Sequence, residues 1–422
     1  MRKGVGVLSA AVFCMMLTAG CQDRVGHEKE RLPENNNPEN VELVVWGSEE
    51  DEDLLNQIIE SFKRKYEGEA DFQIVFQAQG ESKCKDALLA DLENGADVFT
   101  FADDQVNALA AAGGLEPIKE DEAIRSQNLE ATVKAASIKD KIYAYPLTAD
   151  NGYFMYYNKK YFSEQDVETL DRMLEVAEES GKAITMDWSS AWYVYSFFGN
   201  TGMEIGLNPD GITNFCTWNQ TEGSIRGVDV AQAMGRIAES PAFLSRTDEE
   251  FLAGVRNGTV IAGVSGVWNA VAIEEAWGKD LGAAKLPSYT CRGGQVQMAS
   301  FSGCKLVGVN AYSEHYDWAN KLAEWIANEE NQTLRFELRG QGPSNIRASQ
   351  STAVQNAPAI AALLEQSKYA QLQRVGGKFW DPVAEFAGII VEGNPEHENL
   401  QELLDKMVED VTARYFLSFS LN

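Results

Sequence analysis

The chain has 422 residues, which is long for a single domain and sufficient for two domains with sizeable cores. Its 44% hydrophobic and 10% aromatic residues are typical of a globular protein. The 64 acidic and 36 basic side chains give a formal charge of −28, and this field repels nucleic-acid phosphates and anionic lipid head groups, so neither is expected as an electrostatic partner.

The N-terminal segment has the pattern of an export signal. Arg2 and Lys3 precede an uncharged stretch over 4–20 that is too short to stay in a bilayer as a spanning helix. The stretch ends in LTAGC (17–21), which resembles the bacterial lipobox, although the usual leucine three residues before the cysteine is replaced by Thr18.

The lipobox resemblance implies a signal peptide over 1–20 and a lipid on Cys21, which would anchor the protein outside the cell membrane. The alternative is an ordinary secretory signal with an incidental cysteine. Residues 21–40 are polar and rich in Asn, Glu and Pro, which predicts a disordered tether. We expect the folded part to begin near Val41.

The first part of the fold is predicted to alternate strands and helices. The expected order is strand 41–46, helix 53–66, strand 72–77, helix 83–93, strand 96–102 and helix 105–112. This order, with apolar central strands, predicts a mainly parallel α/β sheet. Two further strands are expected at 141–146 and 153–158.

The second part begins with predicted helices at 167–180 and 228–239, which flank an aromatic-rich stretch at 188–202. A strand at 259–267 leads into a helix that starts near Trp268, and another strand follows at 304–309. The remaining helices are predicted at 317–328, 329–338, 357–370, 381–392 and 400–417.

Four cysteines remain after Cys21, and no C-x-x-C motif joins them: Cys84, Cys216, Cys291 and Cys304. We expect buried free thiols, with a pairing of Cys291 and Cys304 left open. The three histidines are far apart in the sequence, at His27, His315 and His397. We therefore expect no metal site and no cofactor.

Motifs for catalysis are missing from the sequence. The segment GVSGV (263–267) does not have the spacing of a nucleophile elbow, and no P-loop, H-E-x-x-H or EF-hand pattern occurs. Carboxylates are numerous, but in so acidic a chain their proximity alone does not predict a glycosidase pair. We expect no catalytic residues.

Aromatic side chains gather where predicted strands end or helices begin, which is where ligands meet the crevice of an α/β sheet. They are Phe101, Trp188, Trp192, Tyr193, Trp268 and Trp380. Flat rings suit the apolar faces of sugars, and neighbouring acids and amides such as Asp104 and Asp150 suit the hydroxyls. For each aromatic taken alone, core packing is the competing interpretation, and for each acid it is a solvated surface.

Six further stretches, considered with LVVWGSEEDE (43–52), carry a family resemblance. They are GADVFTFADDQVNALAAAGGLEPI (95–118), KIYAYPLTADNGYFMYYNKKYF (141–162), NGTVIAGVSGVWNA (257–270), MASFSGCKLVGVN (298–310), GQGPSNIRA (340–348) and GGKFWDP (376–382). In this order the chain resembles the extracellular solute-binding proteins of ABC sugar importers, of the maltose/maltodextrin-binding type.

The resemblance implies a periplasmic-binding-protein-like α/β fold with two lobes joined by a multi-strand hinge. The N-terminal lobe would comprise 41–149 plus 304–344, and the C-terminal lobe 150–303 plus 345–422. The hinge segments would lie near 149–152, 301–303 and 340–345.

The resemblance also implies a set of ligand-binding residues. They are Glu50, Asp51, Phe101, Asp104, Gln105, Asp150, Trp188, Trp192, Trp268, Trp380 and Asp381. Gln105 stands where the family has an arginine, Ser190 where it has a glutamate, and Asp381 where it has a tyrosine. The aromatic set is thus kept while part of the polar set differs.

The implied function is that of a substrate-binding lipoprotein. It would capture an oligosaccharide, with maltodextrin the first choice, and deliver it as a monomer to the transmembrane subunits of an ABC permease. Three alternatives stay open: a binder of another oligosaccharide, a secreted glycoside hydrolase, and a surface adhesion or structural lipoprotein.

Overall fold

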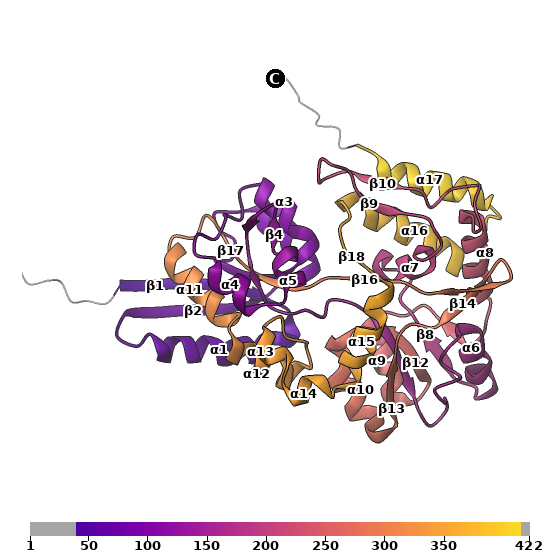
Figure 1. Cartoon of the computed structure of the whole chain (residues 1–422), viewed down its shortest axis with the longest axis horizontal. Helices are drawn as coiled ribbons and strands as arrows, with labels where there is room; N and C mark the ends of the chain where they lie inside the picture. Colours follow the sequence, from indigo (N-terminus) through magenta and orange to yellow (C-terminus); the bar gives the residue numbers. More distant parts are fainter. Residues whose placement is uncertain (1–38, 415–422) are drawn as a thin grey trace, which may run out of the picture. The chain divides into compact units, whose positions relative to one another are not determined.

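The computed structural model describes residues 39–414 of the chain (Figure 1). The predicted signal peptide, Cys21 and nearly all of the predicted tether lie outside the described residues. The first strand begins at Glu39, close to the expected start of the folded part.

The first sheet has five strands in the order β2-β1-β3-β17-β6. Their bounds are β1 Glu39–Gly47, β2 Ala70–Ala78, β3 Val98–Ala102, β6 Tyr145–Pro146 and β17 Lys305–Val309. β1 pairs in parallel with β2 and β3, as predicted. The prediction of a mainly parallel sheet is wrong for β17, which is antiparallel to both β3 and β6. β17 enters this sheet after the chain has passed through a second sheet, and so no crossover helix sets its direction.

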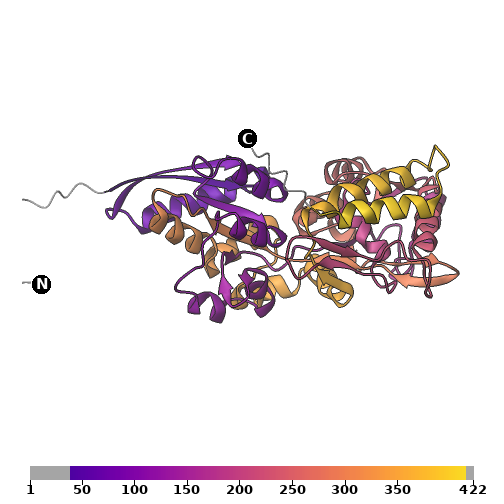
Figure 2. The same ribbon diagram turned by 90° about the horizontal axis from the view of Figure 1, so that it is seen from above.

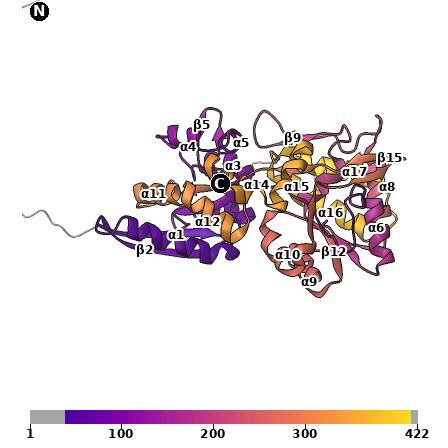
Figure 3. The same ribbon diagram turned by 60° about the horizontal axis from the view of Figure 1, so that its bottom comes forward.

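An amphipathic helix covers part of this sheet. In α1 (Glu52–Lys65) the apolar residues recur at helical spacing, and this face is buried: Leu54, Leu55, Ile58, Ile59 and Phe62. α1 packs on β2, α11 (Tyr316–Ile326) and α12 (Glu329–Arg339), and Figure 3 shows α1 close to α12 and β2. The other helices of this part are α2 Cys84–Ala90, α3 Val106–Ala111, α4 Glu122–Gln127 and α5 Glu130–Ala135.

The second sheet also has five strands, in the order β11-β8-β12-β7-β13. Their bounds are β7 Phe154–Asn158, β8 Ala183–Thr185, β11 Phe243–Leu244, β12 Val260–Ser265 and β13 Leu281–Ala284. β8 is parallel to β11 and β12, whereas β7 is antiparallel to β12 and β13. Both sheets therefore combine a parallel and an antiparallel part.

The remaining helices and short strands lie mostly around the second sheet. The strand pair within 137–142 instead contacts α3 and α5 beside the first sheet, and the short helix at 346–349 contacts α12. Figure 2 shows α16 and α17 running side by side, and the two helices are in contact. The helices are α6 Leu170–Glu179, α7 Ala191–Phe198, α8 Gly227–Ala238, α9 Asp248–Asn257, α10 Ala270–Trp277, α13 Ile346–Ser349, α14 Thr352–Gln355, α15 Pro358–Gln366, α16 Trp380–Val391 and α17 Leu400–Thr412. The paired short strands are β4 Ser137–Ile138 with β5 Lys141–Ile142, β9 Ile205–Leu207 with β10 Asn214–Cys216, β14 Ser288–Cys291 with β15 Gly294–Gln297, and β16 Ser300–Ser302 with β18 Ala370–Leu372.

Hydrogen bonds join the three segments in which the chain passes between the two sheets. Ala149 N donates to Gly342 O at 2.9 Å, and Asn151 N donates to Gly303 O at 3.3 Å. The Asp150 carboxylate accepts a hydrogen bond from Gly342 N. These are the segments in which the sequence places the hinge. The residue bounds of the two lobes stay a prediction.

The four cysteines of the described residues are free thiols, as expected, with Cys84, Cys291 and Cys304 buried and Cys216 half-buried. Of the helices within 39–414, none combines the length and the apolar character needed to cross a membrane.

Asp51 is the buried centre of an ion-pair network in the first part of the chain. Its carboxylate accepts hydrogen bonds from Arg335 Nη1 and, at 2.9 Å, from Arg339 Nε, both on α12. Burial raises the pKa of Asp51, but the charges of Arg335, Lys305 and Arg339 and the Arg335 hydrogen bond outweigh burial and lower it to about 2. Both carboxylate oxygens are thus engaged in holding α12 to the start of α1.

We predict that Asp51→Asn lowers the free energy of unfolding by about 3–5 kcal/mol at pH 7, because buried Arg335 loses its counter-charge. Asp53→Asn, at an exposed position in the first turn of α1, is the control and should change the free energy of unfolding by less than about 1 kcal/mol. Urea titrations of both variants measure the difference.

The same network predicts a pH dependence. The folded pKa of about 2 lies below the ordinary 3.8, so the stabilisation is complete above about pH 4 and is lost as the pH falls towards 2. The Asp51→Asn variant should not show this part of the loss of stability at low pH. If the variant had the same free energy of unfolding as the wild type at pH 7 and the same dependence on pH below 4, this would contradict the role of the network.

Candidate functional site

Two half-buried tryptophans meet in the second part of the chain. Trp192 lies on α7 and Trp268 in the turn that precedes α10, and their ring centroids are 5.6 Å apart with an interplanar angle of 35°. The indole N–H of Trp192 is buried and has no hydrogen-bond partner within the described part of the chain. The pair therefore combines partly exposed rings with an unused donor.

Local structure fixes the Trp268 ring. Trp268 Nε1 donates to Asp248 Oδ2 at 3.0 Å, and Asp248 also accepts from Ser265 Oγ at 2.7 Å. The ring lies against the backbone of Gly266, where an added Cβ would be 1.9 Å from a ring carbon. A glycine is thus needed for this close approach, and the aspartate sets the orientation of the ring.

Tyr153 links this pair to a second aromatic group. Its ring centroid is 4.6 Å from that of Trp192, and its hydroxyl donates to Trp192 O at 2.7 Å and accepts from Phe301 N at 3.2 Å. Phe301 stacks on Tyr195 at 4.1 Å and contacts Trp380 at 6.4 Å. Three predicted stacking residues are thereby joined in one aromatic cluster, which we define as Tyr153, Trp192, Tyr195, Trp268, Phe301 and Trp380.

Two other predicted stacking residues lie in hydrophobic cores. Phe101 is fully buried in the core of the first sheet, where its ring contacts Phe99 at 5.4 Å. Trp188 is fully buried and contacts Phe197 and Phe243. In this structure neither ring has a face open to a ligand, and for both residues the competing interpretation of core packing describes their positions.

The predicted acidic residues divide by environment. Asp104 is half-buried in the 3₁₀ turn Asp103–Gln105 after β3, and burial raises its pKa to about 6, against the effect of the nearby Gln373 amide. Asp150 is 2% exposed, and burial raises its pKa to about 6 despite hydrogen bonds from Thr148 and Gly342. Glu50 and Asp381 are exposed at the starts of α1 and α16.

Gln105 and Asp51 are already occupied by other parts of the chain. The Gln105 side chain accepts from Lys85 N at 2.8 Å and donates to Glu81 O at 2.7 Å, so it fastens the loop before α2. Asp51 is ion-paired with Arg335 and Arg339, as described above. The binding roles of all the predicted residues stay predictions.

Sequence reasoning missed several residues around this site. Tyr153, Tyr195 and Phe301 join the aromatic cluster, and Asp248 orients Trp268 from 20 positions away in the sequence. The aromatic density of 188–202 was a signal for Tyr195. No local pattern marks Asp248, because its partners belong to another strand and turn.

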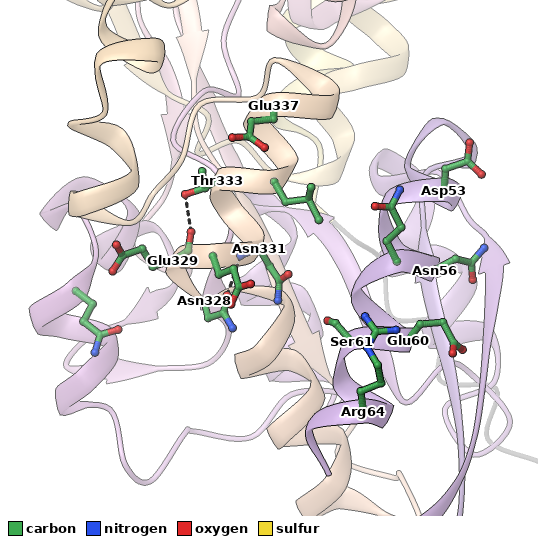
Figure 4. A pocket seen from close by; sticks show the side chains of 14 residues that line it. Asp53, Asn56, Glu60, Ser61, Arg64, Asn328, Glu329, Asn331, Thr333 and Glu337 are labelled. Carbon is green, nitrogen blue, oxygen red and sulfur yellow. Dashed lines mark hydrogen bonds between the residues drawn. The ribbon is translucent and has the colours of Figure 1, made fainter. Parts of the chain in front are cut away.

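A polar pocket of about 1220 Å³ lies elsewhere, between α1 and α12 (Figure 4). Its lining residues include Asp53, Asn56, Glu60, Arg64, Glu329 and Glu337. None of its 14 lining residues is aromatic. This pocket offers no stacking surface, which separates it in chemistry from the aromatic cluster.

The side chains of the aromatic cluster can bind a ligand without taking part in a reaction. Partly exposed rings can cover the apolar face of a ligand. Within residues 39–414 no group of three or more His, Cys, Asp or Glu side chains is arranged to hold a metal ion.

Comparisons with known proteins also indicate a binding protein. The family described as bacterial extracellular solute-binding protein matches residues 57–362. A galactooligosaccharide-binding protein of Bacillus subtilis (strain 168) is 25% identical over 378 residues, which cover 87% of this chain and 86% of the relative. A maltotriose-binding protein of Pyrococcus abyssi (strain GE5 / Orsay) is 24% identical over 389 residues, covering 87% of this chain and 81% of the relative.

Solved structures give the same fold. One determined with acarbose is 26% identical, covers 88% of this chain and 99% of the other, and superposes with a TM-score of 0.79. The expected fold of two α/β lobes joined by a multi-strand hinge is confirmed. The family match spans more than half of the chain, so this is an extracytoplasmic solute-binding protein and not an enzyme. The chain belongs to the family of bacterial extracellular solute-binding proteins.

Proposed function

We propose that the protein captures an oligosaccharide, with a malto-oligosaccharide as the first choice, and delivers it to an ABC permease. The contact between half-buried Trp192 and Trp268 carries the proposal. Two adjoining indole rings suit the apolar faces of sugar rings, and polar side chains beside them, such as Asp248, suit the hydroxyl edges. Relatives named for galactooligosaccharide and maltotriose binding support the ligand class.

Capture proceeds by closure of the two lobes. A sugar bound to one lobe gains contacts that only the other lobe completes, and it shifts the open–closed equilibrium by its differential affinity for the two forms. The lobes are assigned as 41–149 plus 304–344 and 150–303 plus 345–422. The three bonded crossing segments support this division, because each joins a part of one sheet to a part of the other.

Delivery requires the protein to stay near its transporter. The lipobox resemblance supports a lipid anchor on Cys21, followed by a polar tether that leaves the folded part free to meet the permease. The formal charge of −28 would steer docking towards basic surface loops of the transmembrane subunits. A monomer suffices for this cycle.

A second candidate ligand is a galactooligosaccharide, which the name of the Bacillus subtilis relative favours. Stacking rings alone do not separate the two sugars, because both present apolar C–H faces. The polar contacts decide which of the two sugars binds. Three of the expected polar positions differ from the maltodextrin-binding pattern: Gln105, Ser190 and Asp381.

We predict that Trp268→Ala and Trp380→Ala each weaken sugar binding by about 1–3 kcal/mol, because each removes a stacking face. Isothermal calorimetry with the best-bound sugar measures the loss. Trp318→Ala is the matched control, since this tryptophan packs on Phe62, Tyr66 and Phe72 beside the first sheet. It should lower stability and leave affinity unchanged. Unchanged affinity in both test variants would show that the site lies elsewhere.

A calorimetric screen across malto-, galacto-, xylo-, manno- and fructo-oligosaccharides should identify one class that binds with micromolar affinity, worth about 8 kcal/mol. The bound sugar should remain intact, since the protein is not an enzyme. An assay for new reducing ends during prolonged incubation with maltodextrin checks this. Sustained turnover would contradict the binding function.

Cys21→Ser should release the full-length protein from the membrane fraction of the cells that export it, because the sulfur that carries the lipid is gone. Immunoblots of membrane and soluble fractions measure the distribution. Cys216→Ser is the control and should leave the protein at the membrane. Equal membrane retention of the Cys21 variant would rule out the anchor while leaving the sugar-binding proposal intact.

A further inference from the structure

Trp192 and Trp268 are held in place in different ways. The indole N–H of Trp268 donates to Asp248, so a polar contact fixes that ring directly. The indole N–H of Trp192 is buried and has no partner in the part of the chain that the structure describes. The position of the Trp192 ring therefore depends on its backbone and on the rings packed around it.

Tyr153 contacts both the ring and the backbone of Trp192. The two ring centroids are 4.6 Å apart at an interplanar angle of 69°, an edge-to-face arrangement. The Tyr153 hydroxyl donates to Trp192 O at 2.7 Å and accepts from Ser196 Oγ at 3.3 Å. Because Trp192 and Ser196 lie about one turn apart on α7, a single hydroxyl holds this helix at two points.

The first turn of α7 lacks a side-chain cap. Its N-cap residue is Ser190, whose side chain makes no capping hydrogen bond. A side-chain cap normally gives a partner to a backbone N–H group of the first turn and stabilises that end of a helix. Trp192 is the second residue of α7. The Tyr153 hydroxyl therefore holds the uncapped part of the helix, which carries the tryptophan.

The same hydroxyl contacts a crossing segment. Tyr153 directly follows the crossing segment 149–152. Its hydroxyl accepts from Phe301 N at 3.2 Å, where the crossing segment 301–303 begins. A tyrosine hydroxyl has one proton to donate, and its one donated and two accepted hydrogen bonds use its full capacity. Burial raises the pKa of Tyr153 above its ordinary value, so the hydroxyl keeps the proton that it donates.

We propose that Tyr153 is a positioning residue for sugar binding, which holds the Trp192 ring in the orientation on which a sugar ring stacks. This inference rests on the proposed function and deepens it. Tyr153 is fully buried, so it acts through Trp192 and does not contact the sugar itself. Because its hydroxyl also binds Phe301 N, it connects the stacking surface to the segments that cross between the lobes.

A second buried tyrosine provides a matched control on the same helix. Tyr289 is fully buried, and its hydroxyl donates to Phe197 O near the other end of α7. Its ring contacts that of Phe197, with the centroids 5.3 Å apart. Tyr289→Phe therefore removes a hydrogen bond of the same kind, from a phenol to a backbone carbonyl of α7, away from Trp192.

Calorimetry on the folded full chain with maltotetraose and a four-residue galactooligosaccharide tests the effect on affinity. With the tighter of the two sugars, Tyr153→Phe should weaken binding about three- to tenfold, because the ring remains but its hydrogen bond to Trp192 O is lost. Tyr289→Phe should stay within about twofold of the wild type. In a Trp192→Ala background, Tyr153→Phe should weaken binding by less than about twofold, because no indole ring is left to position.

Fluorine NMR of protein labelled with fluorinated tryptophan gives a readout that a change in stability alone does not move. The Trp192 resonance, assigned by its loss in Trp192→Phe, should shift in Tyr153→Phe and keep its position in Tyr289→Phe. The Trp268 resonance should shift less than that of Trp192, because Asp248 holds the Trp268 ring.

Full affinity or an unshifted Trp192 resonance in Tyr153→Phe overturns the positioning role and leaves sugar binding at the tryptophans intact. An equal loss of affinity in Tyr289→Phe, or an undiminished effect of Tyr153→Phe in the Trp192→Ala background, overturns it as well. A wild-type protein that binds neither sugar overturns the proposed function, and this role with it. Both phenylalanine variants keep the ring, and a single cooperative melting transition confirms that they are folded.

Discussion

Hydrogen bonds along 300–304 connect the aromatic cluster to the turn that follows β3. Phe301 N donates to Tyr153 Oη, Ser302 O accepts from Gln373 N, and Cys304 N donates to Asp103 Oδ1 at 3.1 Å. An extended chain advances at most about 3.6 Å per residue, so Phe301 and Cys304 lie within roughly 11 Å of each other.

Asp51 and three aspartates with raised pKa values have opposite effects on stability. Asp51 is paired, and its lowered pKa means that the ionised form favours folding. Burial raises the pKa of Asp103 to about 7 and those of Asp104 and Asp150 to about 6. For a raised pKa the sign reverses: the contribution is most favourable at low pH and is lost as the pH rises from about 4 through the folded pKa. These three aspartates thus reduce stability at neutral pH.

Sequence periodicity predicted most of the fold. The five buried apolar positions of α1 share one helical face, and β1, β2 and β3 were expected close to where they lie. α7 was not predicted, because almost all of its residues are buried and its pattern has no polar face. The direction of β17 depends on the chain returning from the other sheet, which no local pattern encodes.

The sequence predicts less of the candidate site than of the fold. The sequence indicates Trp192, Trp268 and Trp380. It also indicates Phe101, which lies near the end of a strand, but β3 is buried on both faces. Asp51 lies in an acidic run that looks solvated, and its partner Arg335 is 284 residues away.

A crystal structure of the folded chain with maltotetraose, or with the tightest-binding neutral oligosaccharide, tests the central claim most directly. The account predicts a sugar ring over Trp192 or Trp268. A sugar bound in the polar pocket between α1 and α12, with the tryptophan faces uncovered, would contradict it.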